Sequence, residues 1–188
     1  MPRLFTAIEI PSNVAARLSM LRGKLSGARW IDQENYHITL RFAGDVDDVT
    51  ANAFASALEE IQFESFELSI NGLGSFGGNK PRALWAGFQL SEPLIHLQKA
   101  HERAARLAGL PPESRNFTPH VTLARLHDTR ASAVADYLSY FGGAISQPFL
   151  VERFVLYSSK ANHGGGPYVI EETYSSFNED VFREVGFR

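Results

Sequence analysis

The chain has 188 residues, of which 44% are hydrophobic and 21% charged, and its net charge is −3 at pH 7. This size and composition predict one globular domain or a compact pair of lobes, and exclude long disordered or fibrous segments. The absence of cysteine excludes disulfides, a thiolate nucleophile and zinc sites with Cys ligands, and the acidic net charge excludes a domain that coats itself with nucleic acid.

The composition also bears on location. The first ten residues lack the basic and apolar regions of a secretion signal, and no apolar run reaches the roughly 18 residues that a spanning helix needs. We therefore expect a cytoplasmic protein without membrane contact. Any contact with RNA would have to be local.

The first part of the chain alternates between strand and helix patterns. Residues 2–10 predict a buried strand, and the apolar residues after Pro11 recur at helical spacing: Val14, Leu18, Leu21 and Leu25. The pattern turns extended near Trp30. Residues 36–42 then alternate as a strand that closes at Gly44-Asp45, and a second helix is predicted over residues 48–61.

Two short extended runs follow, over residues 66–70 and 82–90. The segment between them, residues 72–78, is rich in glycine and predicts a turn or an irregular loop. No helix start follows this segment, so it does not resemble a phosphate-binding glycine motif.

The rest of the chain predicts further helices and strands. In chain order these are a helix over 92–107 that stops at Gly109, a strand over 117–126, a helix over 131–141, and strands over 149–158 and 168–174 with a glycine-rich loop at 164–166 between them. The mixed order, with several hairpin-like neighbours, predicts an α+β fold with antiparallel or mixed sheets. No linker is visible, and we expect one domain over residues 1–188 whose two lobes divide near residue 90.

One tetrapeptide occurs twice, as His37-Ile38-Thr39-Leu40 and as His120-Val121-Thr122-Leu123. Both copies lie on predicted strands. Side chains at positions i and i+2 of a strand share a face, so each copy points its His and Thr one way and its apolar residues the other. Each strand thus offers an imidazole and a hydroxyl to a cleft while its other face joins the core.

Two such strands facing each other would present two imidazoles and two hydroxyls to one small anion. Phosphodiester cleavage can use that set without a metal ion: one imidazole takes a proton from the attacking oxygen, the other protonates the leaving oxygen, and hydroxyls bind the remaining oxygens. Histidine suits both roles because its ordinary pKa is about 6.5.

A structural interpretation competes with this one. A single His in a strand is more often a hydrogen-bonded structural residue, and Thr39 and Thr122 are also ordinary β-branched strand residues. Two copies in matching contexts favour catalysis, because sheet formation does not select histidine.

With these motifs the chain resembles the two-histidine (2H) phosphoesterase superfamily, in particular its bacterial and archaeal RNA 2′,3′-cyclic phosphodiesterase branch, also called LigT-like 2′-5′ RNA ligases. The resemblance covers nearly the whole chain. Beyond the two motifs it rests on Arg3-Leu4-Phe5, Ala7-Ile8, Trp30, Arg41-Phe42-Ala43-Gly44, Pro81-Arg82-Ala83-Leu84-Trp85-Ala86-Gly87, Phe117-Thr118-Pro119, Ala124-Arg125, Leu156-Tyr157-Ser158-Ser159 and Gly166-Pro167-Tyr168. Thr6 and Ala43 depart from the bulkier apolar residues that the family pattern leads us to expect.

The resemblance implies two pseudo-symmetric lobes of antiparallel sheet, with outer helices, around a central cleft. It implies hydrolysis of RNA 2′,3′-cyclic phosphate ends to 2′-phosphates, no cofactor, and reverse 2′-5′ ligation as a minor activity. His120 would be the base that activates water and His37 the acid that protonates the leaving 3′ oxygen. Thr39, Thr122 and Arg125 would bind the phosphate, and a guanidinium suits that role because it stays charged and can meet an oxyanion with two hydrogen bonds.

Other functions stay open from the sequence. The same site would suit a 2′,5′-phosphodiesterase, a phosphodiesterase of small cyclic nucleotides, or a module that binds RNA ends without turnover. The last is disfavoured because Lys or Arg would hold a phosphate better than two titrating imidazoles. The expected partners are RNA ends or oligonucleotides with a 2′,3′-cyclic phosphate, with no obligatory protein partner.

Several further residues carry weaker expectations. His96 and His101 are expected to be solvated residues of a helix, and His163 to lie in a surface loop. The aromatic residues Phe5, Trp30 and Phe42 could stack on a base but are expected in the core. A local basic cleft is expected to include Arg125, with Arg41, Arg82 or Lys160 as candidates for a further basic residue.

Overall fold

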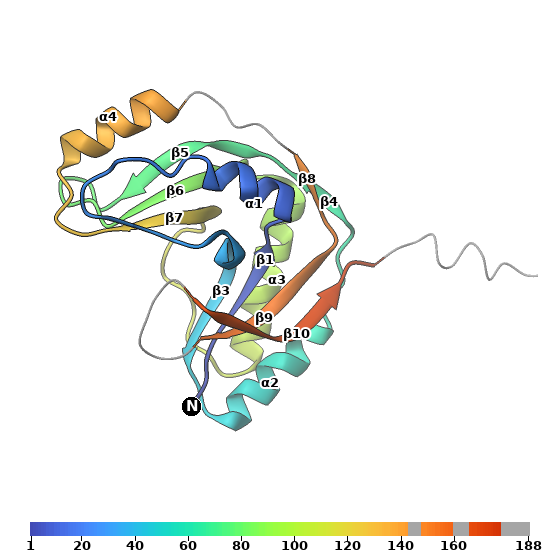
Figure 1. Cartoon of the computed structure of the whole chain (residues 1–188). Coiled ribbons are helices and arrows are strands. Elements are labelled where there is room, and N and C mark those ends of the chain that lie inside the picture. Colours follow the sequence, from blue (N-terminus) through green and yellow to red (C-terminus); the bar gives the residue numbers. More distant parts are fainter. Residues whose placement is uncertain (143–147, 160–165, 178–188) are drawn as a thin grey trace, which may run out of the picture.

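Two antiparallel four-stranded sheets form the body of the computed structural model, which describes residues 1–142, 148–159 and 166–177 (Figure 1). The first sheet has the order β10-β9-β1-β3 and consists of β1 (Arg3–Glu9), β3 (His37–Asp45), β9 (Arg153–Ser159) and β10 (Tyr168–Ser175). The second has the order β2-β7-β6-β5 and consists of β2 (Ala28–Trp30), β5 (Ile70–Phe76), β6 (Ala83–Phe88) and β7 (His120–Leu126). A short pair, β4 (Phe66–Leu68) with β8 (Phe149–Val151), completes the pairing.

Among the described residues, four helices cover these sheets: α1 (Ser12–Ser19), α2 (Asp48–Glu59), α3 (Glu92–Leu107) and α4 (Ala131–Phe141). A short 3-10 turn, η1 (Gln33–Asn35), lies just before β3. The helices α2 and α3 pack against each other, α3 also contacts β3, and α4 contacts β5. The side-chain oxygens of Asp47 and Ser91 cap α2 and α3 by accepting the backbone N–H groups of Thr50 and Leu94. Local capping therefore defines where the two helices begin.

The two sheets repeat one arrangement of three strands. In the first, the strand of the first His motif, β3, pairs with β1, and β1 pairs with β9. In the second, the strand of the second motif, β7, pairs with β6, and β6 pairs with β5. The expected α+β fold with two pseudo-symmetric lobes is confirmed. Strands from both sides of residue 90 enter both sheets, and the lobe boundary near that residue stays a prediction.

Each motif strand contains a β-bulge at the same place. The register of β3 with β1 skips Leu40, and the register of β7 with β6 skips Leu123. A bulge changes which face the following residues occupy. Phe42 and Arg125, each five positions after its histidine, consequently line the same cleft as the histidines, although strict alternation would place them on the opposite face.

The prediction of a loop over residues 72–78 is wrong, because most of this segment belongs to β5. The register with β6 shifts between Ile70 and Leu73, where Gly72 adopts a positive φ of 87°. At Gly74 a Cβ would lie 2.3 Å from the indole of Trp85. The glycines thus accommodate a bulge and a tryptophan ring within a strand. Their high frequency in this segment is the feature that predicted a loop.

Several other boundaries differ from the sequence pattern, among them the following two. The first helix ends at Ser19, although Leu21 and Leu25 beyond it remain buried in the core. The predicted strand over 149–158 is divided at Glu152 into β8 and β9, which pair with different strands. Within the described ranges, no helix is both long and apolar enough to cross a membrane.

Candidate active site

A cleft of about 760 Å³ contains both His motifs. Its lining includes His37, Thr39, Phe42, Phe76, Arg82, Glu113, Arg115, His120, Thr122, Arg125 and Tyr168. The structure thus brings together all five residues that the sequence analysis named: His37, Thr39, His120, Thr122 and Arg125.

The two histidines are held by the same kind of hydrogen bond. Nδ1 of His37 donates to the carbonyl oxygen of Asn35 at 2.8 Å, and Nδ1 of His120 donates to the carbonyl oxygen of Thr118 at 2.7 Å. A carbonyl only accepts, so the proton of each neutral ring lies on Nδ1 and Nε2 remains the free base. Both rings therefore have an Nε2 without a proton to take part in proton transfer.

Aromatic rings pack around each histidine. Around His37 the ring centroids of Phe5 and Tyr168 lie 5.0 Å away, and that of Tyr157 lies 5.9 Å away. Around His120 the centroid of Phe76 lies 4.9 Å away in a T-shaped arrangement, and that of Trp85 lies 6.2 Å away. These rings restrict each imidazole and keep water from one side of it.

Burial changes the acidity of both imidazoles. It lowers the pKa of His37 to about 4, with smaller lowering contributions from the charges of His120 and Arg125 and an opposing one from the hydrogen bond to Asn35. Burial also lowers the pKa of His120, again opposed by its backbone hydrogen bond. Burial thus favours the neutral form of both histidines near pH 7.

The expected phosphate ligands lie beside the histidines. Thr39 and Thr122 are partly exposed to the cleft, two positions after their histidines, and Arg125 is exposed at its edge. No carboxylate lies in hydrogen-bond contact with Arg125 among the residues that the structure describes. Its charge is available to an anion.

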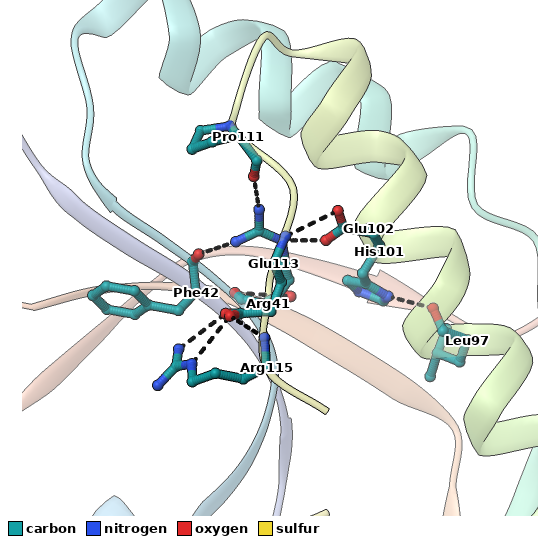
Figure 2. Close-up of polar contacts among 9 residues, drawn as sticks. Arg41, Phe42, Leu97, His101, Glu102, Pro111, Glu113 and Arg115 are labelled. Atoms are coloured by element: carbon teal, nitrogen blue, oxygen red, sulfur yellow. Dashed lines mark hydrogen bonds and ion pairs between the residues drawn. The ribbon is translucent and has the colours of Figure 1, made fainter. Parts of the chain in front are cut away.

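Arg41 is among the residues that line the cleft, but its guanidinium is already paired and is not free to bind an anion. Its side chain is only 5% exposed, and its Nε donates to Glu102 of α3 at 2.6 Å. The other guanidinium nitrogens donate to the carbonyl oxygens of Phe42 and Pro111 (Figure 2). The bulge in β3 turns Arg41 toward α3, and these partners occupy it.

The aromatic expectations have mixed outcomes. Phe5 is buried as expected, but it packs on His37. Trp30 is partly buried and packs near Tyr137. The prediction for Phe42 is wrong, because 43% of this residue is exposed and it lines the cleft.

Of the remaining histidines, His96 is exposed as expected, whereas the prediction for His101 is wrong. His101 is fully buried, donates from Nδ1 to the carbonyl oxygen of Leu97 and packs edge-on against Phe154. Burial lowers its pKa to about 4, so it is a neutral core residue. His163 and Lys160 lie outside the described residues.

Several residues of the cleft are not identifiable as site residues from local sequence patterns. Phe76 was assigned to the glycine-rich loop, and Tyr168 entered only through the Gly166-Pro167-Tyr168 match. At Gly166 a Cβ would lie 2.3 Å from the Asn35 side chain, so this glycine permits the approach of the segment that carries Tyr168. The segment before β7 was not assigned a role, although Glu113 and Arg115 line the cleft.

In the parts of the chain that the structure describes, no group of three or more His, Asp or Glu side chains is placed so that it could hold a metal ion.

Comparisons with known proteins identify the family of this chain. The model of the 2′-5′ RNA ligase superfamily matches residues 10–163. A protein named RNA 2′,3′-cyclic phosphodiesterase from Aeropyrum pernix is 35% identical over 123 residues, which cover 62% of this chain and 70% of that protein. One of the same name from Aquifex aeolicus is 32% identical over 154 residues, covering 78% and 81%.

A solved structure shares the fold. The crystal structure of E. coli LigT complexed with 3′-AMP matches with a TM-score of 0.77 at 24% sequence identity, and the match covers 95% of this chain and all of that chain. This similarity concerns the arrangement of strands and helices.

Proposed function

The chain belongs to the 2′-5′ RNA ligase superfamily, the two-histidine phosphoesterases, and from this premise we propose that it hydrolyses RNA 2′,3′-cyclic phosphate ends to 2′-phosphates without a metal ion. The observation that carries the proposal is the pair of Nδ1-anchored imidazoles, His37 and His120, whose strands supply the two hydroxyls of one cleft. Relatives named RNA 2′,3′-cyclic phosphodiesterase support the choice of substrate.

The proposed reaction uses the two imidazoles on opposite strands. Nε2 of His120 accepts a proton from water as the water oxygen attacks phosphorus, and His37 donates a proton from Nε2 to the 3′ oxygen as its bond to phosphorus breaks. The 2′ ester remains. With the 5′-hydroxyl of another RNA in place of water, the same steps form a 2′-5′ linkage, which we propose as a minor reverse activity.

This assignment sets a requirement on His37. With a pKa of about 4, His37 by itself is neutral near pH 7. To act as the acid, it must have its pKa raised by the bound phosphate. A negative charge within a few ångströms favours the imidazolium and raises the pKa. Binding of the substrate phosphate therefore favours the protonated form of His37 that the cleavage needs.

The proposed phosphate ligands replace a metal ion. Thr39 and Thr122 would donate hydroxyl hydrogen bonds to the non-bridging oxygens, and the guanidinium of Arg125 would balance the negative charge that builds up as water adds. Fixed donors in a partly buried cleft stabilise such charge without reorganisation of solvent. The chemistry can therefore proceed with protein groups alone.

The experiment is product analysis on a short RNA that ends in a 2′,3′-cyclic phosphate, beside a 2′-5′ linked dinucleotide, with enzyme dialysed against EDTA. We expect a 2′-phosphate product and little cleavage of the dinucleotide. Activity that disappears in EDTA and returns with a divalent ion would reject the metal-independent mechanism. Binding of the RNA without any turnover would favour the RNA-end binding module.

Histidine variants test the pair in the same assay. His37→Ala and His120→Ala should each remove most of kcat, by about 10²–10⁴-fold for a lost acid or base, and the double variant should lose little more because the two act in one cycle. His96→Ala, on the exposed side of α3, is the matched control and should keep full activity. A folded single variant with normal turnover would show that its histidine is structural.

A further inference from the structure

The cleft carries more positive charge than one cyclic phosphate requires. Its lining includes three exposed guanidinium groups, those of Arg82, Arg115 and Arg125, whereas Glu113 is the one carboxylate residue in the described lining. A cyclic phosphate diester has a single negative charge. Arg82 directly precedes β6, and its carbonyl accepts the N–H of Leu126, so it lies next to Arg125 and serves the same end of the cleft.

Arg115 stands apart from these two, on the segment between α3 and β7. Its Nε and Nη2 donate to the two carboxylate oxygens of Glu113 at 3.0 and 2.9 Å, and its backbone N–H donates to Glu113 Oε1 at 3.0 Å. The side chain is nevertheless 76% exposed. A guanidinium has five N–H donors, so this paired fork orients Arg115 and leaves donors for a second anion.

The segment that carries Arg115 is anchored at its start. The backbone N–H of Glu113 donates to Glu102 Oε1 at 3.2 Å, while Glu102 Oε2 accepts from the buried Arg41 at 2.6 Å. Arg41 also donates to the carbonyl of Pro111, so one buried guanidinium joins β3, α3 and this segment (Figure 2). A charged pair with this little exposure holds its neighbours in place more firmly than a surface pair.

The segment is also anchored at its end. The carbonyl of Thr118 accepts from Nδ1 of His120, and the carbonyl of Pro119 accepts the backbone N–H of Phe88 in β6. Arg115 thus lies between an anchor to the strand of the first histidine and an anchor to the second histidine itself. The segment that carries Arg115 is therefore held at both ends, beside the strands of the two histidines.

We propose that Arg115 binds a second phosphate, the phosphodiester one nucleotide upstream of the cyclic end, and so makes the enzyme prefer oligonucleotides to mononucleoside cyclic phosphates. The inference rests on the proposed function and names its substrate class. A cleft of about 760 Å³ lies in the upper part of the range of about 300–1,000 Å³ that takes drug-sized ligands, so it has room beyond the terminal nucleotide. Glu113 orients the guanidinium, and Arg41 with Glu102 positions the segment.

The first measurement compares kcat/KM for a mononucleoside 2′,3′-cyclic phosphate with that for a trinucleotide that ends in the same group. Arg115→Ala should lower the trinucleotide-to-mononucleotide ratio about tenfold, which corresponds to about 1.4 kcal/mol. Arg115→Lys should restore only part of the ratio, because an ammonium group keeps the charge without the fork. Arg106→Ala, on the exposed side of α3 and outside the cleft lining, should leave the ratio unchanged.

A binding measurement gives the same information without turnover. Titration calorimetry with a trinucleotide 2′-phosphate should show about tenfold weaker binding to Arg115→Ala, and the slope of log affinity against log salt should become shallower by roughly 0.7, as expected for one lost phosphate contact on a single strand. Binding of the mononucleotide 2′-phosphate should not show this change of slope.

The outcomes separate this inference from the proposed function. Wild-type hydrolysis of both substrates with a ratio that Arg115→Ala does not change overturns the role of Arg115 and leaves the proposed function intact. If the wild-type enzyme hydrolyses neither substrate, the proposed function is overturned. The calorimetric titration then decides the role of Arg115. If Arg82→Ala lowers the trinucleotide-to-mononucleotide ratio and Arg115→Ala does not, the second phosphate binds at Arg82 and our assignment is rejected.

Discussion

The chemistry of this cleft depends on which nitrogen of each imidazole is free. A backbone carbonyl two residues before each histidine accepts from Nδ1, so both rings present Nε2. The aromatic residues around them, Phe5 and Tyr168 at His37 and Phe76 at His120, restrict the rings and contribute to the burial that lowers both pKa values. The side chains themselves thus predispose both histidines to be neutral until an anion binds.

This predisposition predicts how the rate depends on pH. In the free protein the pKa of His37 is about 4 and that of His120 is below its ordinary value. The profile of kcat/KM reports the free enzyme, so we expect a bell whose limbs lie on the acid side of those of ordinary imidazoles. Bound phosphate raises both pKa values, so the kcat bell should lie at higher pH.

Rates measured from pH 3 to pH 9 on a cyclic nucleotide check this expectation. The limbs belong to the pair of histidines, since the two sites interact. A kcat/KM profile without a limb that can be attributed to an imidazole would mean that His37 and His120 are not the acid and base. Superimposable profiles of kcat and kcat/KM would contradict the effect of the phosphate.

At the scale of elements, small irregularities in the strands determine what faces the cleft. The bulges at Leu40 and Leu123 bring Phe42 and Arg125 to the cleft side of their strands. In β5, the close approach of Gly74 to the Trp85 ring leaves that ring in place beside His120. Departures from regular strand geometry therefore determine which side chains face the cleft.

The approach of Gly74 to Trp85 predicts the effect of one added methyl group. Gly74→Ala places a Cβ 2.3 Å from the indole, so the ring must move or the strands must separate. We expect a loss of about 1–3 kcal/mol in the free energy of unfolding, the usual cost of overpacking, and lower activity because Trp85 packs near His120. Urea denaturation measures the loss of stability, near-UV circular dichroism reports a displaced indole, and the cyclic phosphodiesterase assay measures the activity.

Gly23 provides the matched control. A Cβ at Gly23 would meet the nearest side-chain atoms at 3.7 Å, an ordinary contact distance, and its φ is not in the positive range. Gly23→Ala should therefore be neutral or stabilise the protein by about 0.4–1 kcal/mol through the unfolded chain. Equal stability of Gly74→Ala and Gly23→Ala would show that Trp85 yields to the added methyl group without cost.

For the whole molecule, the relevant fact is that a chain with a net charge of −3 carries a locally positive cleft. The exposed positive charge of this cleft comes from three guanidiniums, those of Arg82, Arg115 and Arg125, whereas Arg41 is paired with Glu102. RNA should therefore be held at its end and not along the surface.

This charge distribution predicts a shallow dependence of RNA binding on salt. Two or three phosphate contacts on a single strand correspond to a slope of log affinity against log salt of about −1.4 to −2. Fluorescence anisotropy with a labelled RNA of about ten nucleotides, with the salt concentration varied from 50 to 200 mM, measures it. A slope that corresponds to roughly 6–10 contacts would contradict recognition of an RNA end in a small cleft.

Whatever depends on local periodicity could be predicted from the sequence. The helices over 92–107 and 131–141, the strand of each His motif and the shared face of His and Thr follow from spacings within a few residues. The family resemblance added Arg125, for which strict alternation of the strand provided no support, because only the bulge at Leu123 turns it toward the cleft.

The tertiary structure alone decided which residues of the same type are free and which are occupied. Arg41 and Arg125 follow their motifs at similar offsets, yet Arg41 pairs with Glu102, 61 positions away in the chain, whereas Arg125 faces the cleft. His101 is buried although its helix position does not predict it, and Arg115 reaches the cleft on a segment without regular structure. Burial and pairing arise between segments distant in sequence, and local spacing contains no information about them.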